Sequence, residues 1–382
     1  MHIMENILAI GSTTQPPPHV GDWVEVRSKQ EILKTLDRNG QLDKMPFMPE
    51  MYAFCGKRFR VYKRAHKTCD TVYEYKGRKM KDAVHLEGVR CDGQSHGGCE
   101  ASCLIFWKTA WLRTLDQPNA ASGIPQTGEG EERNGEVTQC TEADVVAGTR
   151  KPVAENGGPA YVCQATQVPV ATQPLPWWEW RQYVEDYTSG NVALGRIAKT
   201  FAYMAYRHGL VDLGIGIGPA LRWLYNRFQS LRGGTPYPHR NGKLPAGGRT
   251  PTVNLNLQPR EWVRVKSFDA IRATCDTSNT NRGMTFDAEM VPYCGGTYRV
   301  LKRVTKILNE KTGRMQEMKT PCIILDSVVC QARYSDCRPF CPRSIYPYWR
   351  EIWLERVEAH APGTGDAGIT TPAPNAHSEV LA

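Results

Sequence analysis

The sequence predicts an α+β fold with two duplicated small β-rich modules, each with a cysteine cluster, separated by a disordered linker and a helical hairpin. The main observation is a cysteine- and tryptophan-rich stretch over residues 91–111, which returns in degraded form over residues 330–353. Runs of alternating apolar and polar residues precede both copies, as expected for strands with one buried face. Self-similarity at a fixed separation is typical of a repeated structural unit.

Composition narrows the class of protein. A chain of 382 residues suggests two or three domains. The net charge of +9 allows an anionic partner, although it is modest for this length. We find no secretory signal and no run of eighteen apolar residues, so we expect a cytoplasmic protein with no membrane contact. In that reducing compartment, the 13 cysteines indicate metal binding or catalysis rather than disulfides.

The first module is predicted over residues 20–115, after a disordered start over residues 1–19 that contains three consecutive prolines. Val24 and Val26 alternate with polar residues in the first strand. We expect strands at residues 21–28, 56–64 and 83–90. Residues 106–115 should close the module as a short helix.

The second module is predicted over residues 259–358 because its segments match the first in order and spacing. Residues 262–267 match 23–28, residues 294–303 match 55–64, and residues 324–330 match 85–91. The pair Trp107 and Trp111 returns as Trp349 and Trp353.

The remaining segments are assigned by composition. Residues 116–176 are rich in Gly, Pro, Thr and Glu, and predict a disordered linker. Residues 177–232 have apolar residues at helical spacing and predict a helical hairpin. A second linker is expected over residues 233–258, and a disordered tail over residues 359–382.

Two resemblances follow from these motifs. The opening Gly-Asp-Trp-Val-Glu-Val and the later Gly-x-x-Phe/Tyr-Arg-Val resemble SH3-like barrels of the KOW type. This resemblance implies a small barrel in each module. The whole pattern also resembles an uncharacterised bacterial family with two tandem cysteine-rich modules, which implies no particular activity.

Four cysteines match between the modules, and four thiolates can hold a tetrahedral zinc ion or an iron–sulfur cluster. The last two of each set are four residues apart, which is about one helical turn. Zinc is the cofactor that we expect, and an iron–sulfur cluster is the alternative. Small buried apolar thiols are the competing interpretation. The predicted ligands are Cys55, Cys91, Cys99 and Cys103 in the first module and Cys294, Cys330, Cys337 and Cys341 in the second.

Other polar residues extend the candidate site. His96 could be a ligand in place of Cys55, although a solvated loop histidine is the simpler interpretation. Glu50 and Glu289 are matched acids that could serve acid–base chemistry, but more often such acids cap turns or pair with a matched arginine.

The sequence therefore predicts a metal-binding protein that acts as a binding or scaffold component with a protein partner, in a bacterial biosynthetic pathway. The first alternative is an iron–sulfur or metal-dependent enzyme with its active site in the first module. The second is a single-stranded nucleic-acid binding protein, in which Arg60 and Arg299 of the basic, aromatic strips contact the strand.

Overall fold

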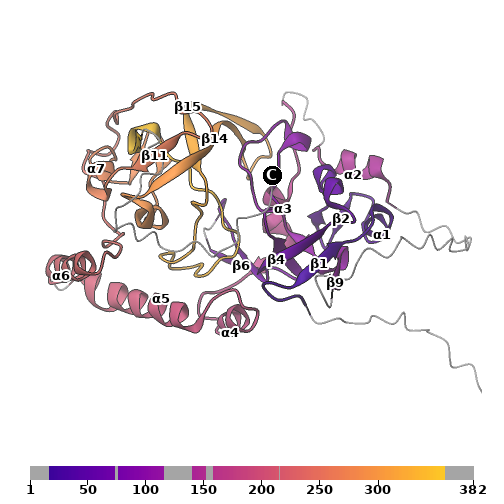
Figure 1. Cartoon of the computed structure of the whole chain (residues 1–382), viewed down its shortest axis with the longest axis horizontal. Helices are drawn as coiled ribbons and strands as arrows, with labels where there is room; N and C mark the ends of the chain where they lie inside the picture. The colour runs from indigo at the N-terminus through magenta and orange to yellow at the C-terminus, as the bar shows by residue number, and fades with distance from the viewer. Residues whose placement is uncertain (1–16, 74–75, 116–139, 152–157, 215, 358–382) are drawn as a thin grey trace, which may run out of the picture.

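The computed structural model describes residues 17–73, 76–115, 140–151, 158–214 and 216–357. It is a mixed α+β structure with several small sheets, in which two groups of strands lie side by side (Figure 1). Helices α6 (Gly218–Leu231) and α5 (Leu194–Tyr206) run below the group of strands that contains β14, and α4 (Arg181–Thr188) lies where the two groups meet (Figure 1). In the described part of the chain, no helix is long and apolar enough to cross a membrane.

The first module is built on an antiparallel sheet with the strand order β8-β7-β4-β1-β9. Val24 and Val26 of β1 are fully buried, as the alternation predicted. Ser28 and Glu31 form a capping box that starts α1 immediately after this strand. The main elements are β1 (Trp23–Val26), α1 (Lys29–Leu33), β4 (Arg58–Arg64), β7 (Ala83–Leu86), β8 (Trp107–Lys108) and β9 (Leu112–Leu115).

Shorter elements complete this module, and one prediction is wrong here. The closing helix expected at residues 106–115 is instead β8, a single 3₁₀ turn and β9. Trp107 pairs with Val84, and Leu112 pairs with Val26, so the sheet competes successfully for this segment. The shorter elements are β2 (Gln41–Leu42), β3 (Met45–Pro46), η1 (Pro49–Phe54), β5 (Lys67–Cys69), β6 (Gly77–Lys79), η2 (Gln94–His96) and η3 (Thr109–Trp111).

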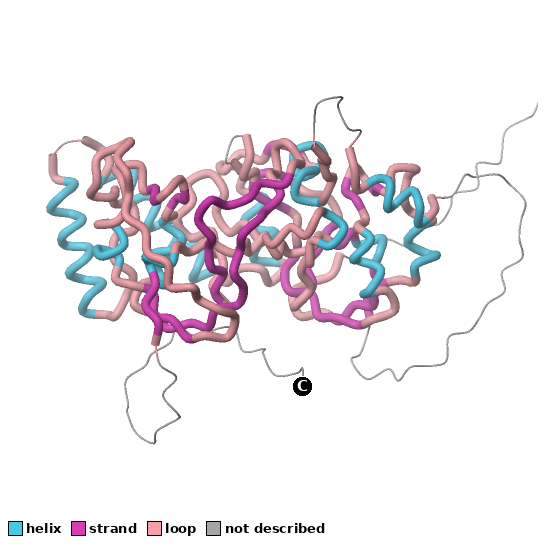
Figure 2. Tube along the Cα trace, turned by 90° about the horizontal axis from the view of Figure 1, so that it is seen from above, coloured by secondary structure: helices cyan, strands magenta, loops and turns pink. Residues whose placement is uncertain are grey.

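The second module contains a sheet with the strand order β15-β14-β11-β16. Its two longest strands, β14 and β15, form a hairpin that is longer than the sequence predicted. Figure 2 shows strands in the middle of the molecule. The elements are β11 (Trp262–Val265), α7 (Phe268–Arg272), β12 (Thr280–Asn281), β13 (Met284–Thr285), η5 (Ala288–Tyr293), β14 (Thr297–Leu308), β15 (Met315–Leu325), η6 (Glu351–Trp353) and β16 (Leu354–Arg356).

Corresponding residues have corresponding partners in the two modules. Trp23 lies opposite Arg60 in the first sheet, and Trp262 lies opposite Arg299 in the second. The indole nitrogen of Trp111 donates to Thr35 Oγ1 at 3.1 Å. The indole nitrogen of Trp353 donates to Thr274 Oγ1 at 3.0 Å in the same way.

The prediction of a disordered linker over residues 116–176 does not hold for its described parts. These contain α2 (Glu142–Gly148), α3 (Gln164–Ala171) and β10 (Gln173–Pro174). Cys140, Val145 and Cys163 pack into the core of the first module. The composition of this segment did not indicate helices, because a short helix that covers an existing core needs only a few apolar residues. Residues 116–139 and 152–157 lie outside the described residues, as do most of the predicted disordered start and tail.

The predicted helical hairpin contains three helices rather than two. They are α4 (Arg181–Thr188), α5 (Leu194–Tyr206) and α6 (Gly218–Leu231), with the π-helical turn η4 (Arg207–Val211) after α5. Within the described residues, the connector 233–258 contains no helix or strand.

The hairpin of β14 and β15 joins the two modules. Leu308 belongs to the core of the first module. Glu100 Oε2 accepts hydrogen bonds from the backbone nitrogens of Thr305 at 2.5 Å and Lys306 at 3.1 Å. The backbone nitrogen of Tyr161 donates a hydrogen bond to the carbonyl oxygen of Gly313 at 2.7 Å. The modules therefore share hydrogen bonds and core residues.

Candidate metal centre

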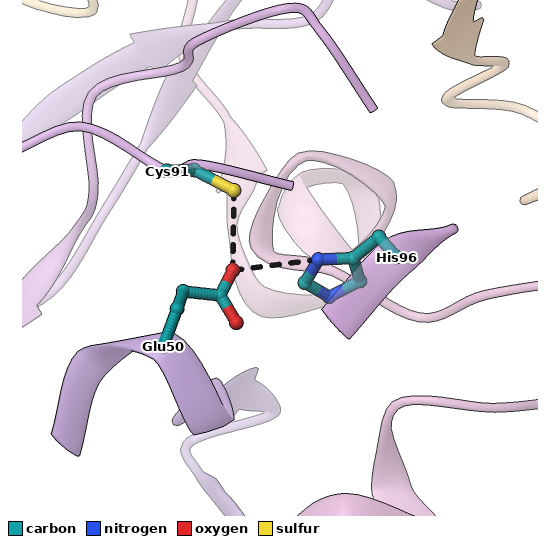
Figure 3. A group of neighbouring side chains, drawn as sticks. All are labelled: Glu50, Cys91 and His96. Carbon is teal, nitrogen blue, oxygen red and sulfur yellow. Dashed lines mark hydrogen bonds and ion pairs between the residues drawn. The ribbon is translucent and has the colours of Figure 1, made fainter. Parts of the chain in front are cut away.

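Three side chains of different chemistry converge in the first module. One ligand atom each from Glu50, Cys91 and His96 lies within 4.8 Å of the other two. The Cys91 thiol donates to Glu50 Oε1 at 3.1 Å, and His96 Nδ1 lies 3.4 Å from the same oxygen (Figure 3). Within the described chain, no other group of three histidine, cysteine or acidic residues meets this distance. A carboxylate, a thiolate and an imidazole are all ligands of zinc.

Local backbone structure explains the convergence. Glu50 lies in the first turn of η1, which starts at Pro49. Cys91 follows an isolated bridge, and its backbone nitrogen donates to Cys103 O at 2.9 Å. His96 ends η2, which is flanked by Gly93 (φ 76°) and Gly97 (φ 66°) in the left-handed region. A Cβ atom at Gly93 would also collide with the backbone of Cys99, so this turn needs glycine.

The hydrogen bonds of His96 determine which of its ring nitrogens carries a lone pair. Nε2 lies 3.1 Å from the carbonyl oxygen of Val162, and a carbonyl can only accept, so Nε2 carries the proton. If the imidazole is neutral, Nδ1 carries no proton, and its lone pair faces Glu50 Oε1. Two lone pairs facing each other need a cation between them, either a proton on Nδ1 or a metal ion.

Unsatisfied buried atoms point to the same place. Glu50 Oε2 and His96 Nδ1 are both buried and have no hydrogen-bond partner among the described residues. His96 is 1% exposed, so water cannot hydrate its ring freely. Unpaired buried polar atoms are costly unless something satisfies them. A metal-bound histidine commonly donates its other nitrogen to a backbone carbonyl, as His96 does to Val162.

The electrostatics show which groups would have to lose protons. Burial raises the pKa of Glu50, but its interaction with the His96 ring 3.4 Å away outweighs burial, and the pKa lies below its ordinary value. Burial and the Glu50 charge raise the pKa of the Cys91 thiol. Without a metal ion the thiol is therefore protonated at neutral pH, consistent with its donation to Glu50.

A small cavity of about 40 Å³ adjoins these residues. Cys91, Cys99 and Cys103 of the predicted set line it, together with His96 and Cys163. Burial raises the pKa of Cys103 to about 11 and that of Cys163 to about 12. Neither thiol belongs to the group of ligand atoms that lie within 4.8 Å of one another. Cys99 is already engaged, because its sulfur accepts from the backbone nitrogen of Leu308 at 3.2 Å.

Cys55 lies apart from this cavity. It caps the C-terminal end of η1 and packs against the edge of the first core. Burial raises the pKa of its thiol, against the opposing charge of Lys29. The structure therefore brings three of the four predicted ligands of this module to one cavity, and it places a ligand atom of His96 within 4.8 Å of that of Cys91.

The predicted ligands of the second module are spread further. Cys330 and Cys341 lie together beside Cys69, which comes from the first module. Cys337 is exposed, whereas Cys294 packs against the core of the second module. The tetrathiolate sets remain predictions, and the geometry favours a mixed ligand set in the first module.

The second module offers its matched acid a backbone donor on one oxygen, whereas Glu289 Oε2, like Glu50 Oε2, is buried without a hydrogen-bond partner among the described residues. Glu289 corresponds to Glu50 and is 6% exposed. Its Oε1 accepts a hydrogen bond from the backbone nitrogen of Tyr334 at 2.5 Å, so a backbone donor occupies the place that a histidine ring has in the first module. Burial nevertheless raises the pKa of Glu289 above its ordinary value.

The two arginines predicted to contact nucleic acid lie at matched sheet positions. Arg60 Nε donates to Gly21 O at 3.3 Å. The Arg299 guanidinium lies 5.7 Å from the ring centre of Trp262.

The sequence favoured a structural role for Glu50 over a role as a metal ligand. Its match with Glu289 was the feature of the sequence that singled it out. In comparisons with known proteins, no family model matches the chain, and no curated protein matches it either.

Proposed function

We propose that the protein is a metal-stabilised binding protein whose first module holds one zinc ion through Glu50, Cys91 and His96. The observation that carries this proposal is the convergence of Glu50, Cys91 and His96, in which the buried Nδ1 of His96 lies 3.4 Å from the Glu50 carboxylate. A zinc ion there would accept both lone pairs. Its charge would also favour loss of the Cys91 proton.

A structural role for the ion is better supported than a catalytic one. The adjoining cavity of about 40 Å³ has room for only a few water molecules, since one water needs about 10–15 Å³ of such a cavity. A substrate would not fit without rearrangement. The ligands come from η1, the segment after β7 and η2, so the ion would connect three short segments that are separate in the sequence.

We also propose that the two modules arose by duplication of one SH3-like unit and that the second lost its metal. The order of elements from β1 to β4 matches that from β11 to β14, and the Trp–Thr and Trp–Arg pairs correspond. The second copy has a backbone donor at Glu289 where the first has His96. We therefore expect one equivalent of zinc per chain, not two.

Metal analysis of the purified full-length chain tests this proposal. The wild type should contain about one zinc, and His96→Ala and Glu50→Gln should each lower its affinity by about tenfold or more. Cys55→Ser and Cys294→Ser are the matched controls, and both should keep the metal. Loss of metal in the controls, or a full equivalent of zinc in His96→Ala, would refute the ligand assignment. A brown protein with iron and sulfide would favour the iron–sulfur alternative.

A further inference from the structure

A groove of about 530 Å³ lies where helix α6, the connector and the second module meet, and none of the candidate metal ligands lines it. Arg222 and Trp223 of α6 line it, together with Arg240 from the connector and Arg272 at the end of α7. Helices α6 and α7 lie at the same end of the molecule (Figure 1). The groove therefore combines three segments that are separate in the sequence.

Positive charge exceeds negative charge in this groove. Asp269 pairs with Arg272 at 2.9 Å and with Arg240 at 3.3 Å, and its side chain is 62% exposed. Within the described chain, Arg222 makes no ion pair. Burial and repulsion from Arg272 and Arg222 hold the pKa of Arg240 below its ordinary value, despite Asp269. Two guanidinium groups thus share one carboxylate and that of Arg222 has none, so an anionic ligand would balance the excess positive charge.

Neighbouring contacts hold the arginines in place without the ligand. The guanidinium groups of Arg240 and Arg272 lie 5.9 Å and 5.7 Å from the ring centre of Phe268. Arg272 Nε also donates to Asn241 O at 2.8 Å. This arrangement reduces the ordering that binding would require.

An exposed tryptophan borders the same groove. Trp223 is 67% exposed. The indole is one of the largest apolar side chains, so its exposure to water is unfavourable and a ring stacked on it would be stabilising. Nucleotide units commonly bind where an aromatic ring stands beside a cationic groove, because the base stacks and the phosphate pairs.

We propose that this groove binds a phosphate ester that carries a planar ring, as a nucleotide unit does. Arg222, Arg240 and Arg272 contact the phosphate, since planar guanidinium groups match phosphate oxygens two at a time. Trp223 stacks on the ring. A free nucleotide and a single strand of nucleic acid offer the same chemistry, so the experiment distinguishes them.

The test measures binding to the full-length chain by fluorescence anisotropy. The probes are labelled AMP and a labelled oligothymidylate of about ten nucleotides. Arg222→Gln should raise Kd by about ten- to a hundredfold, because a charged hydrogen bond is lost. Trp223→Ala should raise it by about five- to a hundredfold through lost stacking. Arg227→Gln, on the same helix but outside the groove, should bind like the wild type.

Each outcome decides between ligands or refutes the site. Tight binding of AMP identifies a free nucleotide. Binding of the oligonucleotide alone identifies a strand, and its salt slope should then fall by about 0.7 in Arg222→Gln. Unchanged binding in both groove variants, or no binding of either probe, would overturn the proposal. If inorganic phosphate displaces the labelled probe as strongly as unlabelled AMP does, and Trp223→Ala leaves Kd unchanged, then the groove does not recognise a planar ring. Melting curves check that both variants fold.

Discussion

Lys67 Nζ lies 2.5 Å from Asp186 Oδ2, and the two side chains are 3% and 0% exposed. The pair joins β5 of the first module to α4. Lys67 also donates to the carbonyl oxygen of Pro339, which belongs to the second module, at 2.9 Å. Burial lowers the pKa of Lys67, and the attraction of Asp186 only partly compensates. One buried cation therefore connects both modules to the helical segment.

Removing one partner of this pair should destabilise the fold. Asp186→Asn leaves a buried charge uncompensated, and we expect the free energy of unfolding to fall by about 3–5 kcal/mol. Urea denaturation monitored by circular dichroism measures this.

The matched control is the neighbouring pair of Arg64 and Glu185, which lies 3.0 Å apart and is partly exposed. Glu185→Gln should cost about 0–1 kcal/mol. The double variant Lys67→Met, Asp186→Leu should recover much of the loss. Equal costs for the two single variants would show that burial does not determine the strength of these pairs.

The tryptophan–threonine pairs should contribute similarly in the two modules. Thr35→Val and Thr274→Val each leave a fully buried indole N–H without its partner, at a cost of about 1–3 kcal/mol. Thr188→Val removes an exposed hydrogen bond and should cost less than about 0.5 kcal/mol. Thermal unfolding compares them. A large effect in one module only would weaken the case for duplication.

Glu100 should make the free energy of unfolding depend on pH in the acidic range. Burial raises its pKa, but hydrogen bonds from Thr305 and Lys306 outweigh this, so the pKa lies below the ordinary value of 4.5. The native state then binds fewer protons than the unfolded state. The stabilisation is complete above pH 4.5 and disappears as the pH falls through the lowered pKa. The melting temperatures of wild type and Glu100→Gln should therefore converge in acid. A constant difference between them would contradict this role.

Zinc should stabilise the protein, and its affinity should rise with pH. At a free concentration of a hundred times Kd, a ligand that binds only the native state adds about 2.7 kcal/mol. The raised pKa of the Cys91 thiol means that metal binding releases a proton. Calorimetric titration in buffers of different ionisation enthalpy counts the protons. Cys55→Ser should release as many as the wild type, and a pH-independent affinity would exclude Cys91 as a ligand.

The sequence predicted the strands better than it predicted the candidate metal centre. Val24 and Val26 alternate with polar neighbours, and a buried face follows directly from that pattern. The closing helix failed because Trp107 and Leu112 gain more from pairing with β7 and β1 than from a helical turn. Local patterns cannot report such long-range pairing.

Ligand convergence depends on how loops fold, which spacing alone does not determine. Cys99 and Cys103 are four residues apart, yet no helix forms there, so the helical argument for a shared face does not apply. Cys163 was assigned to a disordered linker, but it lines the cavity because α3 packs on the first core. Glu50 becomes a candidate ligand only when η1 places it beside Cys91.

X-ray absorption at the zinc edge of the loaded protein tests the metal centre most directly. The account predicts a mixed shell, with one or two sulfurs at about 2.3 Å and the remaining nitrogen and oxygen ligands at about 2.0–2.2 Å. His96→Ala should remove the histidine contribution, whereas Cys55→Ser should leave the spectrum unchanged. A shell of four sulfurs, or a shell without sulfur, would contradict a site made by Glu50, Cys91 and His96.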